Sequence, residues 1–317
     1  MDVREELAAN GRARLRAVLL ALGIAAATWY YRPVRMEIDG RRQRRLVVPA
    51  DIEQAVVTMA ETNPWHGYKR IAVMCRRDGT AVTDRQAYAA MSAHGLLHKR
   101  KPVRAAGLYQ ASKLYELLPT APNDLWQMDV TYVHIPGHGW WYAVTVIDYY
   151  SRFLLALRLT WSYSANEVIA ALEEARAAAE AIHGPLTKPP FLVTDNGSSF
   201  IARAFGRYVR DDFAHVRIQY RTPTQLGLLE RFHQTFKDEE VYWRLYDGPQ
   251  HARECFAEFH RRYSQVRPHW ALRPEEGGDP LVPADVYVNS RRIQVPRWQP
   301  WAREAKRRLD QLLVLSA

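Results

Sequence analysis

The sequence predicts an α/β core over residues 124–266, preceded by an all-α region and followed by a short C-terminal extension. Two patterns support this prediction. Three β-rich runs follow one another after Asp124, and helices and strands then alternate to the end of the core. The segment 49–101, by contrast, has the pattern of three short helices. A chain of 317 residues is long enough for two or three such domains, and its 48% apolar and 25% charged residues are ordinary for a globular protein.

Residues 1–48 are predicted to form a helical segment followed by a basic loop. The apolar stretch 17–27 is shorter than the ~20 residues that a membrane span needs, and no small-residue cleavage pattern follows it. We therefore expect a buried helix that ends before Pro33, no membrane contact and a cytoplasmic protein. The loop carries four arginines that either are simply solvated or contact phosphates: Arg41, Arg42, Arg44 and Arg45.

Residues 49–101 show the pattern of a helix-turn-helix domain. Two helices are expected at about 51–61 and 67–77, and Thr83 with Gln86 forms a capping box for a third helix that stops at Gly95. Arg85 and Gln86 can face outward on this helix, which makes them candidate DNA contacts in a major groove. Three amphipathic helices also occur in many other folds. The proline-containing segment 102–123 is predicted to be a linker.

The core itself opens with three strand-like runs, LWQMDVTYVHI, WWYAVTVIDYYS and RFLLALRLT. Ser164 and Glu167 are predicted to form a capping box for a long alanine-rich helix, which ends near Ile182 before Gly184 and Pro185. A short strand FLVTD, a helix over about 199–210 and a fifth strand VRIQYR follow. A long helix then starts near Thr224.

Cysteine and histidine usage argues against structural metal or disulfide sites. Cys75 and Cys255 are the two cysteines, and they lie far apart without a Cys-x-x-Cys pair. His134 and His138 have ligand-like spacing, but they bracket a Pro-Gly pair that favours a plain turn.

Three acidic residues stand in separate settings that suit phosphodiester chemistry. Asp129 lies mid-way along the first strand, Asp195 ends the FLVT strand, and Glu230 lies on an amphipathic helix. Hard oxygen ligands on different rigid elements can converge on divalent cations. Each residue also has a simpler interpretation: an Asp on an edge strand, an Asp-Asn-Gly turn, and a solvated helical Glu. The nearby acidic cluster Asp238, Glu239 and Glu240 is interpreted as a solvated helix face.

The contexts of these carboxylates, in LWQMDVTYVHIP, FLVTDNGSSF and LGLLERFHQTFK, resemble the integrase-type DDE transposases of bacterial insertion sequences, within the retroviral integrase superfamily. The resemblance extends over about residues 50–290 and implies a ribonuclease-H-like core. It implies that Asp129, Asp195 and Glu230 are catalytic and hold two Mg²⁺ ions, for which Mn²⁺ can substitute. Leu226 departs from the family, which usually has an amide-bearing residue there, and this puts the conformation of the 222–228 loop in doubt.

The resemblance also implies further roles. Lys237 would contact a DNA phosphate, and His233, Arg267 and His269 are further candidate DNA contacts, whereas Asp148 has a structural role. The function implied is cleavage of element ends and strand transfer into target DNA. Double-stranded DNA is the expected partner, with a homo-oligomer on the DNA and an upstream-frame protein as further partners.

The charge distribution agrees with a DNA-binding, nucleoid-associated protein. The net charge of +10 divides into +9 for residues 1–120, −2 for 121–266 and +3 for the basic extension 267–317. The extension would bind either DNA or a second subunit. Two rival functions are a DNA-binding regulatory or targeting protein with a dormant core, and a ribonuclease-H-like nuclease.

Overall fold

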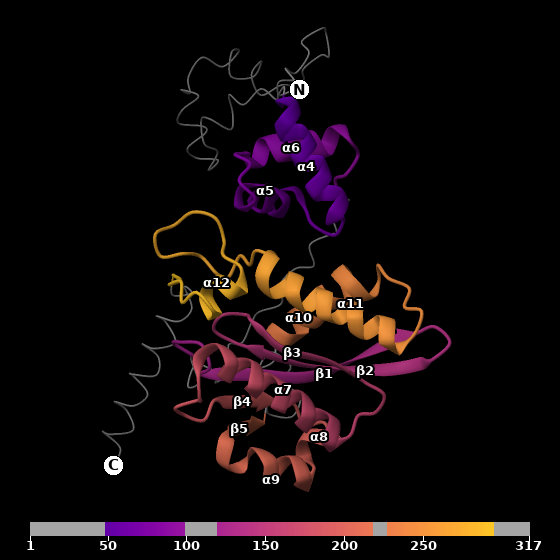
Figure 1. Cartoon of the computed structure of the whole chain (residues 1–317), viewed down its shortest axis with the longest axis vertical. Helices are drawn as coiled ribbons and strands as arrows, with labels where there is room; N and C mark the ends of the chain where they lie inside the picture. The colour runs from indigo at the N-terminus through magenta and orange to yellow at the C-terminus, as the bar shows by residue number, and fades with distance from the viewer. Residues whose placement is uncertain (1–47, 99–118, 218–226, 295–317) are drawn as a thin grey trace, which may run out of the picture. The chain divides into compact units, whose positions relative to one another are not determined.

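The computed structural model of the protein describes residues 48–98, 119–217 and 227–294 (Figure 1). Several predictions lie outside these ranges: the helical segment and basic loop before residue 48, most of the linker, the end of the fifth strand, the loop around Leu226, and the tail after residue 294. No helix in the described ranges is both long enough and apolar enough to span a bilayer.

Three short helices form the first described unit of structure: α4 (Ala50–Thr62), α5 (Tyr68–Arg77) and α6 (Asp84–Ala93). They pack around a small apolar core of their own, which includes Val56, Ile71 and Met91. The predicted capping box is confirmed, because the Thr83 hydroxyl accepts a hydrogen bond from the Gln86 backbone N–H while the Gln86 side chain accepts one from the Thr83 N–H. These local signals fix where α6 begins.

Five strands form one mixed sheet in the order β3-β2-β1-β4-β5. Their bounds are β1 (Leu125–Ile135), β2 (Gly139–Asp148), β3 (Leu154–Thr160), β4 (Phe191–Thr194) and β5 (Ala214–Arg217). The first three strands are antiparallel, whereas β4 and β5 run parallel to β1. This is the ribonuclease-H-like arrangement predicted from the order of elements.

Helices cover both faces of the sheet (Figure 1). On one face lie α7 (Ala165–His183), α8 (Ser198–Ile201) and α9 (Arg203–Asp212), and on the other lie α10 (Gly227–Phe236) and α11 (Pro249–Arg261). Alternate residues of β1 supply the two cores: Trp126 and Met128 pack with α7, while Val133 and Ile135 pack with α10 and α11. The sheet is therefore buried on both sides.

The start of α7 differs in detail from its prediction. Ser164 caps the helix by accepting from the Glu167 N–H, as expected. The Glu167 carboxylate, however, pairs with Arg158 on β3. A cross-element ion pair thus replaces the second half of the predicted capping box.

Two π-helical turns extend α10 and α11: η3 (Lys237–Val241) and η4 (Arg262–Val266). In η3 Glu239 and Glu240 are buried, at 6% and 1% exposed, so the prediction of a solvated acidic face is wrong there. Glu240 pairs with Arg262 at 3.1 Å, and Arg267 donates to both oxygens of Glu239 at 2.7–3.0 Å. The two arginines compensate carboxylates that would otherwise be costly to bury.

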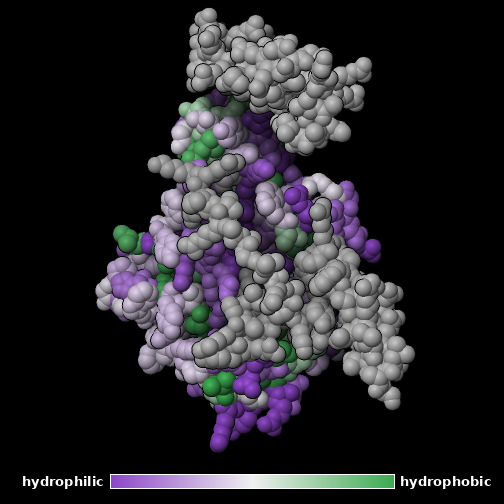
Figure 2. All heavy atoms as spheres, turned by 180° about the vertical axis from the view of Figure 1, so that it is seen from behind, coloured by the Kyte–Doolittle hydropathy of each residue, from purple (hydrophilic) through white to green (hydrophobic). Residues whose placement is uncertain are grey.

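The residues after 266 pack closely on the core as far as residue 294. Helix α12 (Pro283–Tyr287) places Tyr287 against Phe153, with ring centroids 4.5 Å apart, and the Tyr287 hydroxyl donates to Asn123 at 2.6 Å. Leu272, Leu281 and Val286 form a further buried cluster. Seen from behind, the described surface is mainly hydrophilic, and its hydrophobic residues form small separate spots (Figure 2).

Candidate active site

Asp129 lies in the middle of β1, directly opposite Thr145 of β2. Its side chain is 21% exposed, and one carboxylate oxygen accepts a hydrogen bond from the Val130 N–H at 2.8 Å. β1 is an interior strand of the sheet, because it has β2 on one side and β4 on the other. The ladder to β4 covers only Leu125–Gln127, so Asp129 lies just beyond the point where these two strands part.

Asp195 follows the last residue of β4, next to β1 in the sheet. Its Oδ1 accepts a hydrogen bond from the Gly197 N–H at 2.9 Å, so the predicted Asp-Asn-Gly turn is present around this carboxylate. Gly197 is required there for space: a Cβ atom at this position would lie 2.0 Å from the Tyr163 hydroxyl oxygen. Tyr163 thereby packs against the turn that holds Asp195.

Glu230 is exposed in the first turn of α10. The opposite side of this helix carries Leu229, Phe232 and Phe236, which are buried against the sheet. This amphipathic packing holds α10 on the sheet and leaves the Glu230 side chain outside the core.

The three carboxylates interact electrostatically. The pKa of Asp129 is raised to about 7, first because the group is buried, and further because of the negative charges of Asp195 and Glu230; the Val130 hydrogen bond acts in the opposite direction. In the described parts of the chain, however, no three acidic, histidine or cysteine side chains are already gathered closely enough to hold a metal ion. Asp195 and Glu230 are thus close enough to affect the pKa of Asp129, but the three carboxylates do not yet form a metal-binding cluster.

His233, which was predicted as a DNA contact, is a partner of Asp129 in the structure. Its ring is only 12% exposed; Nδ1 lies 3.6 Å from the Asp129 carboxylate, and Nε2 is 3.0 Å from the Thr145 hydroxyl. Burial and the charge of Lys237 lower the pKa of His233 to about 4, so the ring is neutral near pH 7. A neutral imidazole packs beside Asp129 and carries no positive charge that could attract a phosphate.

Arg267 and His269, two further predicted DNA contacts, have partners within the protein. Arg267 is 7% exposed and its guanidinium is engaged by Glu239. His269 is held against Arg267 at 3.2 Å, and burial, followed by the charge of Arg267, lowers its pKa well below the usual value. Both residues stabilise the packing of the chain after η4, and their predicted contact with DNA stays a prediction.

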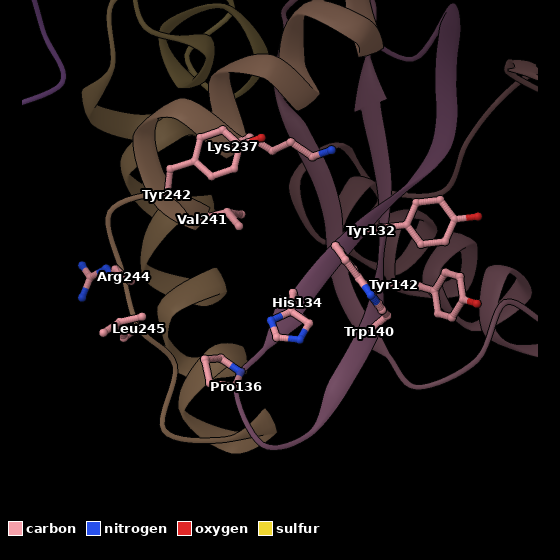
Figure 3. Close-up of a pocket in the computed structure, with 10 residues that line it drawn as sticks. All are labelled: Tyr132, His134, Pro136, Trp140, Tyr142, Lys237, Val241, Tyr242, Arg244 and Leu245. Carbon is pink, nitrogen blue, oxygen red and sulfur yellow. The ribbon is translucent and has the colours of Figure 1, made fainter.

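The other predicted contacts keep accessible side chains. Arg85 is exposed on α6, whereas Gln86 is half-buried and its amide oxygen is used in the capping box. Lys237 begins η3 and lines a cavity beside β1 (Figure 3). Lys237 does not pair with Glu240 three residues later, because among the described residues Glu240 pairs with Arg244 and Arg262.

Asp148 has the structural position that was predicted for it. It is fully buried at the end of β2 and accepts hydrogen bonds from the backbone N–H groups of Ser151 and Asn123 at 2.7 and 2.9 Å. Burial raises its pKa to about 6 despite these bonds. The carboxylate therefore organises the turn after β2.

Two residues near the carboxylates had not been assigned these roles from the sequence. His233 lies one helical turn after Glu230, a spacing that places both on adjacent parts of α10, but its contact with Asp129 depends on how α10 packs on β1. Tyr163 precedes α7, and no spacing rule connects it with Gly197. Its position could be found only from the folded arrangement.

Comparison with known proteins finds similarity over the region that contains these carboxylates. The integrase core domain family matches residues 119–225, and a second family of the same description matches residues 211–274. The chain is therefore similar to the integrase core domain over residues 119–274. Asp129 and Asp195 both fall inside the first matched range, and Glu230 falls inside the second.

Two bacterial relatives of the chain come from insertion elements. One is an uncharacterized 39.2 kDa protein of insertion element IS476 from Xanthomonas euvesicatoria, 28% identical over 71% of this chain and 64% of the relative. The other is an uncharacterized 31.7 kDa protein of IS407 from Burkholderia multivorans, 26% identical over 68% of this chain and 76% of the relative. The match therefore spans just under two thirds of the IS476 protein.

Solved structures similar to the chain include the catalytic core domain of the HTLV-2 integrase in complex with magnesium. It is 17% identical, covers 53% of this chain and 98% of that one, and has a TM-score of 0.40. A simian T-cell lymphotropic virus intasome, in complex with a PP2A regulatory subunit, is 16% identical over 77% of this chain and 75% of its own, with a TM-score of 0.39.

Proposed function

We propose that the protein is a DNA transposase that cleaves the ends of an insertion element and joins them to target DNA. Asp129, Asp195 and Glu230 are its catalytic carboxylates. The observation that carries this proposal is the state of Asp129, which is mostly buried in the middle of the sheet while two further carboxylates raise its pKa. A structural aspartate in that position would be expected to have a cationic partner, not two anionic neighbours.

The donor set fits Mg²⁺ or Mn²⁺. All three side chains offer carboxylate oxygens, the ligands that these hard cations prefer, and they come from β1, the end of β4 and α10. A divalent cation would also favour the ionised form of Asp129 against the effects that raise its pKa. When bound, two such ions supply nucleophile activation and charge stabilisation for phosphoryl transfer.

The protein's own residues prepare this site. Thr145 donates a hydrogen bond to the Asp129 carbonyl at 3.1 Å and also contacts His233, so it links β1, β2 and α10 around the carboxylate. The Gly197 N–H orients the Asp195 carboxylate. These contacts hold two of the three acidic groups in place before DNA arrives, which limits the reorganisation needed for reaction.

The test replaces each carboxylate with its isosteric amide. Asp129→Asn, Asp195→Asn and Glu230→Gln should each abolish Mg²⁺-dependent cleavage and joining of end DNA, because each change removes a charge that binds the cation. Binding to end DNA should stay near the wild-type level. Asp247→Asn is the matched control, since this aspartate is 89% exposed and lies outside the site.

Substantial Mg²⁺-dependent joining by any one of the three amide variants would refute its assignment. A wild-type protein that binds end DNA but neither cuts nor joins it under the same conditions would favour the regulatory alternative with a dormant core. Element ends, target DNA and further copies of the chain are the partners that this proposal requires.

A further inference from the structure

The distal part of the β1–β2 hairpin carries an aromatic ladder. Tyr132 lies directly opposite Tyr142, and His134 lies directly opposite Trp140. The two pairs have ring centroids 5.2 and 5.1 Å apart. Because residues two positions apart on a strand point to the same face, the four rings form one continuous row.

This row is unusually open to solvent for aromatic residues. Trp140 is 66% exposed and Tyr132 is 56% exposed, whereas most large aromatic side chains of the described core are buried. Exposed apolar surface that gathers in one place, unlike single scattered residues, is typical of a binding site. Stability of the hairpin alone does not require these rings, since Val133 and Ile135 on the other face already bury it.

The ladder forms one wall of a cavity of about 770 Å³. The opposite wall comes from η3 and the turn after it (Figure 3). Residues of that wall that matter here are Lys237, Tyr242 and Arg244. The volume lies within the roughly 300–1,000 Å³ of typical ligand pockets.

The ladder leads toward the carboxylates. Tyr132 is three residues after Asp129 on the same strand, a distance of about 10 Å at 3.3 Å per residue. Tyr142 stacks on Tyr163 with centroids 5.9 Å apart and planes at 22°, and Tyr163 packs against the turn of Asp195. The aromatic row therefore reaches the turn of Asp195 through Tyr163, whereas Asp129 points to the other face of β1.

The charge of the cavity indicates an anionic ligand. Its lining contains Lys237 and Arg244 but no acidic residue. Arg244 is neutralised by Glu240 and Glu258, whereas no salt bridge of Lys237 occurs among the described residues. Aromatic faces next to an unneutralised lysine are the two features that bind single-stranded nucleic acid, through base stacking and phosphate contact.

We propose that this cavity binds unpaired DNA bases within the first few nucleotides of the scissile phosphate, with Tyr132, Trp140 and Tyr242 as stacking residues and Lys237 on the backbone. The inference rests on the proposed function for the position of the phosphate. Stacking accepts any base, so the site would hold a displaced or frayed strand without reading its sequence. Paired duplex DNA hides its base faces and would not fill it.

The test measures binding by the full-length protein without divalent metal, so that it is independent of catalysis. Two labelled probes are compared at one salt concentration: single-stranded oligothymidylate and a blunt duplex. Tyr132→Ala, Trp140→Ala and Tyr242→Ala should each weaken binding to the single strand by roughly 5- to 150-fold, the loss of stacking on one base. Binding to the duplex should change by less than twofold.

Two kinds of control keep the result specific. Trp161→Ala removes a tryptophan that is 71% exposed but lies outside the cavity, and it should leave both affinities unchanged. Tyr132→Phe and Trp140→Phe keep an aromatic ring and should retain most of the single-strand affinity, which separates stacking from misfolding.

Unchanged single-strand affinity in all three alanine variants would overturn the inference. An equal loss for the blunt duplex would also overturn it, because the surface would then bind DNA in general. So would a loss of self-association in sedimentation with DNA affinity retained, since the ladder would then be a subunit interface. These binding measurements do not depend on catalysis. Their outcome is therefore independent of whether the amide variants of the three carboxylates lose cleavage and joining.

Discussion

Asp129 carries the clearest chemical signal at the scale of single residues. Its pKa of about 7 means that the folded, metal-free protein holds a proton that the unfolded chain, with an ordinary aspartate pKa near 3.8, has already released. Between these two values the folded state binds more protons than the unfolded state. The free energy of unfolding therefore decreases as the pH rises through this range, as far as Asp129 alone is concerned.

This gives a prediction for the metal-free protein. The stability of Asp129→Asn relative to wild type should increase from pH 4 to pH 7 and then level off, because the amide cannot ionise. Urea unfolding in the presence of a chelator measures the difference at each pH. Adding Mg²⁺ at pH 8 should raise the midpoint of the wild type and not that of the variant. A difference that stays constant with pH would contradict the raised pKa.

At the scale of elements, the sequence predicted most of what depends on local pattern. The capping residues Thr83 and Ser164, the hairpin turn at Pro136-Gly137 and the sequential order of strands and helices in the core all agree with the structure. Such features are determined by a few neighbouring residues or by the alternation of side chains. The turn of Asp195 and its position at the end of β4 belong to the same category.

The errors have a common physical cause. Glu239 follows the buried Phe236 by three residues and Glu240 follows it by four, so periodicity already placed them on the inward face of the helix. Their acidic character favoured the solvated interpretation instead. The two glutamates are buried because each pairs with an arginine, and these arginines lie 22 and 28 positions further along the chain. A pairing at that separation cannot be obtained from local spacing.

The buried pair itself gives the second prediction. Glu239→Leu or Arg267→Met alone should lower the free energy of unfolding by about 3–5 kcal/mol, because each leaves an uncompensated charge in the interior. The double variant should lose less than the sum of the two, since it removes both charges. Denaturant unfolding of the wild type, the two single variants and the double variant gives the coupling energy of the pair in a double-mutant cycle.

The exposed pair Arg291 and Glu276 serves as the control cycle. Both side chains are largely solvated, at 48% and 60% exposed, so their coupling should not exceed about 1 kcal/mol. Equal coupling energies in the two cycles would contradict a special role for the buried pair.

At the scale of the whole molecule, we propose that recognition and chemistry are divided between residues 49–101 and 124–266. The first segment would select the element end through α6, and the second would act on the phosphate. In a protein organised in this way, a variant can lose the preference for element-end DNA and still cleave and join DNA strands. Separate variants in the two segments can therefore test the division.

The third prediction follows from that division. Arg85→Ala should reduce the preference for end DNA over random DNA by about 1–3 kcal/mol, if this exposed arginine reads a base edge. Lys69→Ala, at an exposed position on α5, should weaken binding to all DNA more evenly, as a phosphate contact would. Competition binding at several salt concentrations distinguishes the two. An unchanged preference in Arg85→Ala would move base reading away from this residue.

The Glu239–Arg267 contact also has a consequence for protein engineering. The helix that presents Glu230 continues into η3, and η3 depends on an arginine beyond the end of the α/β core. In the other direction, Glu239 lies within 3.9 Å of Arg70 on α5. Residue 266 is the apparent end of the α/β core. A hybrid protein joined there would take Glu230 and η3 from one parent and Arg267, which stabilises η3, from the other. Hybrids with insertion-element relatives should keep residues 227–294 as a single inherited block.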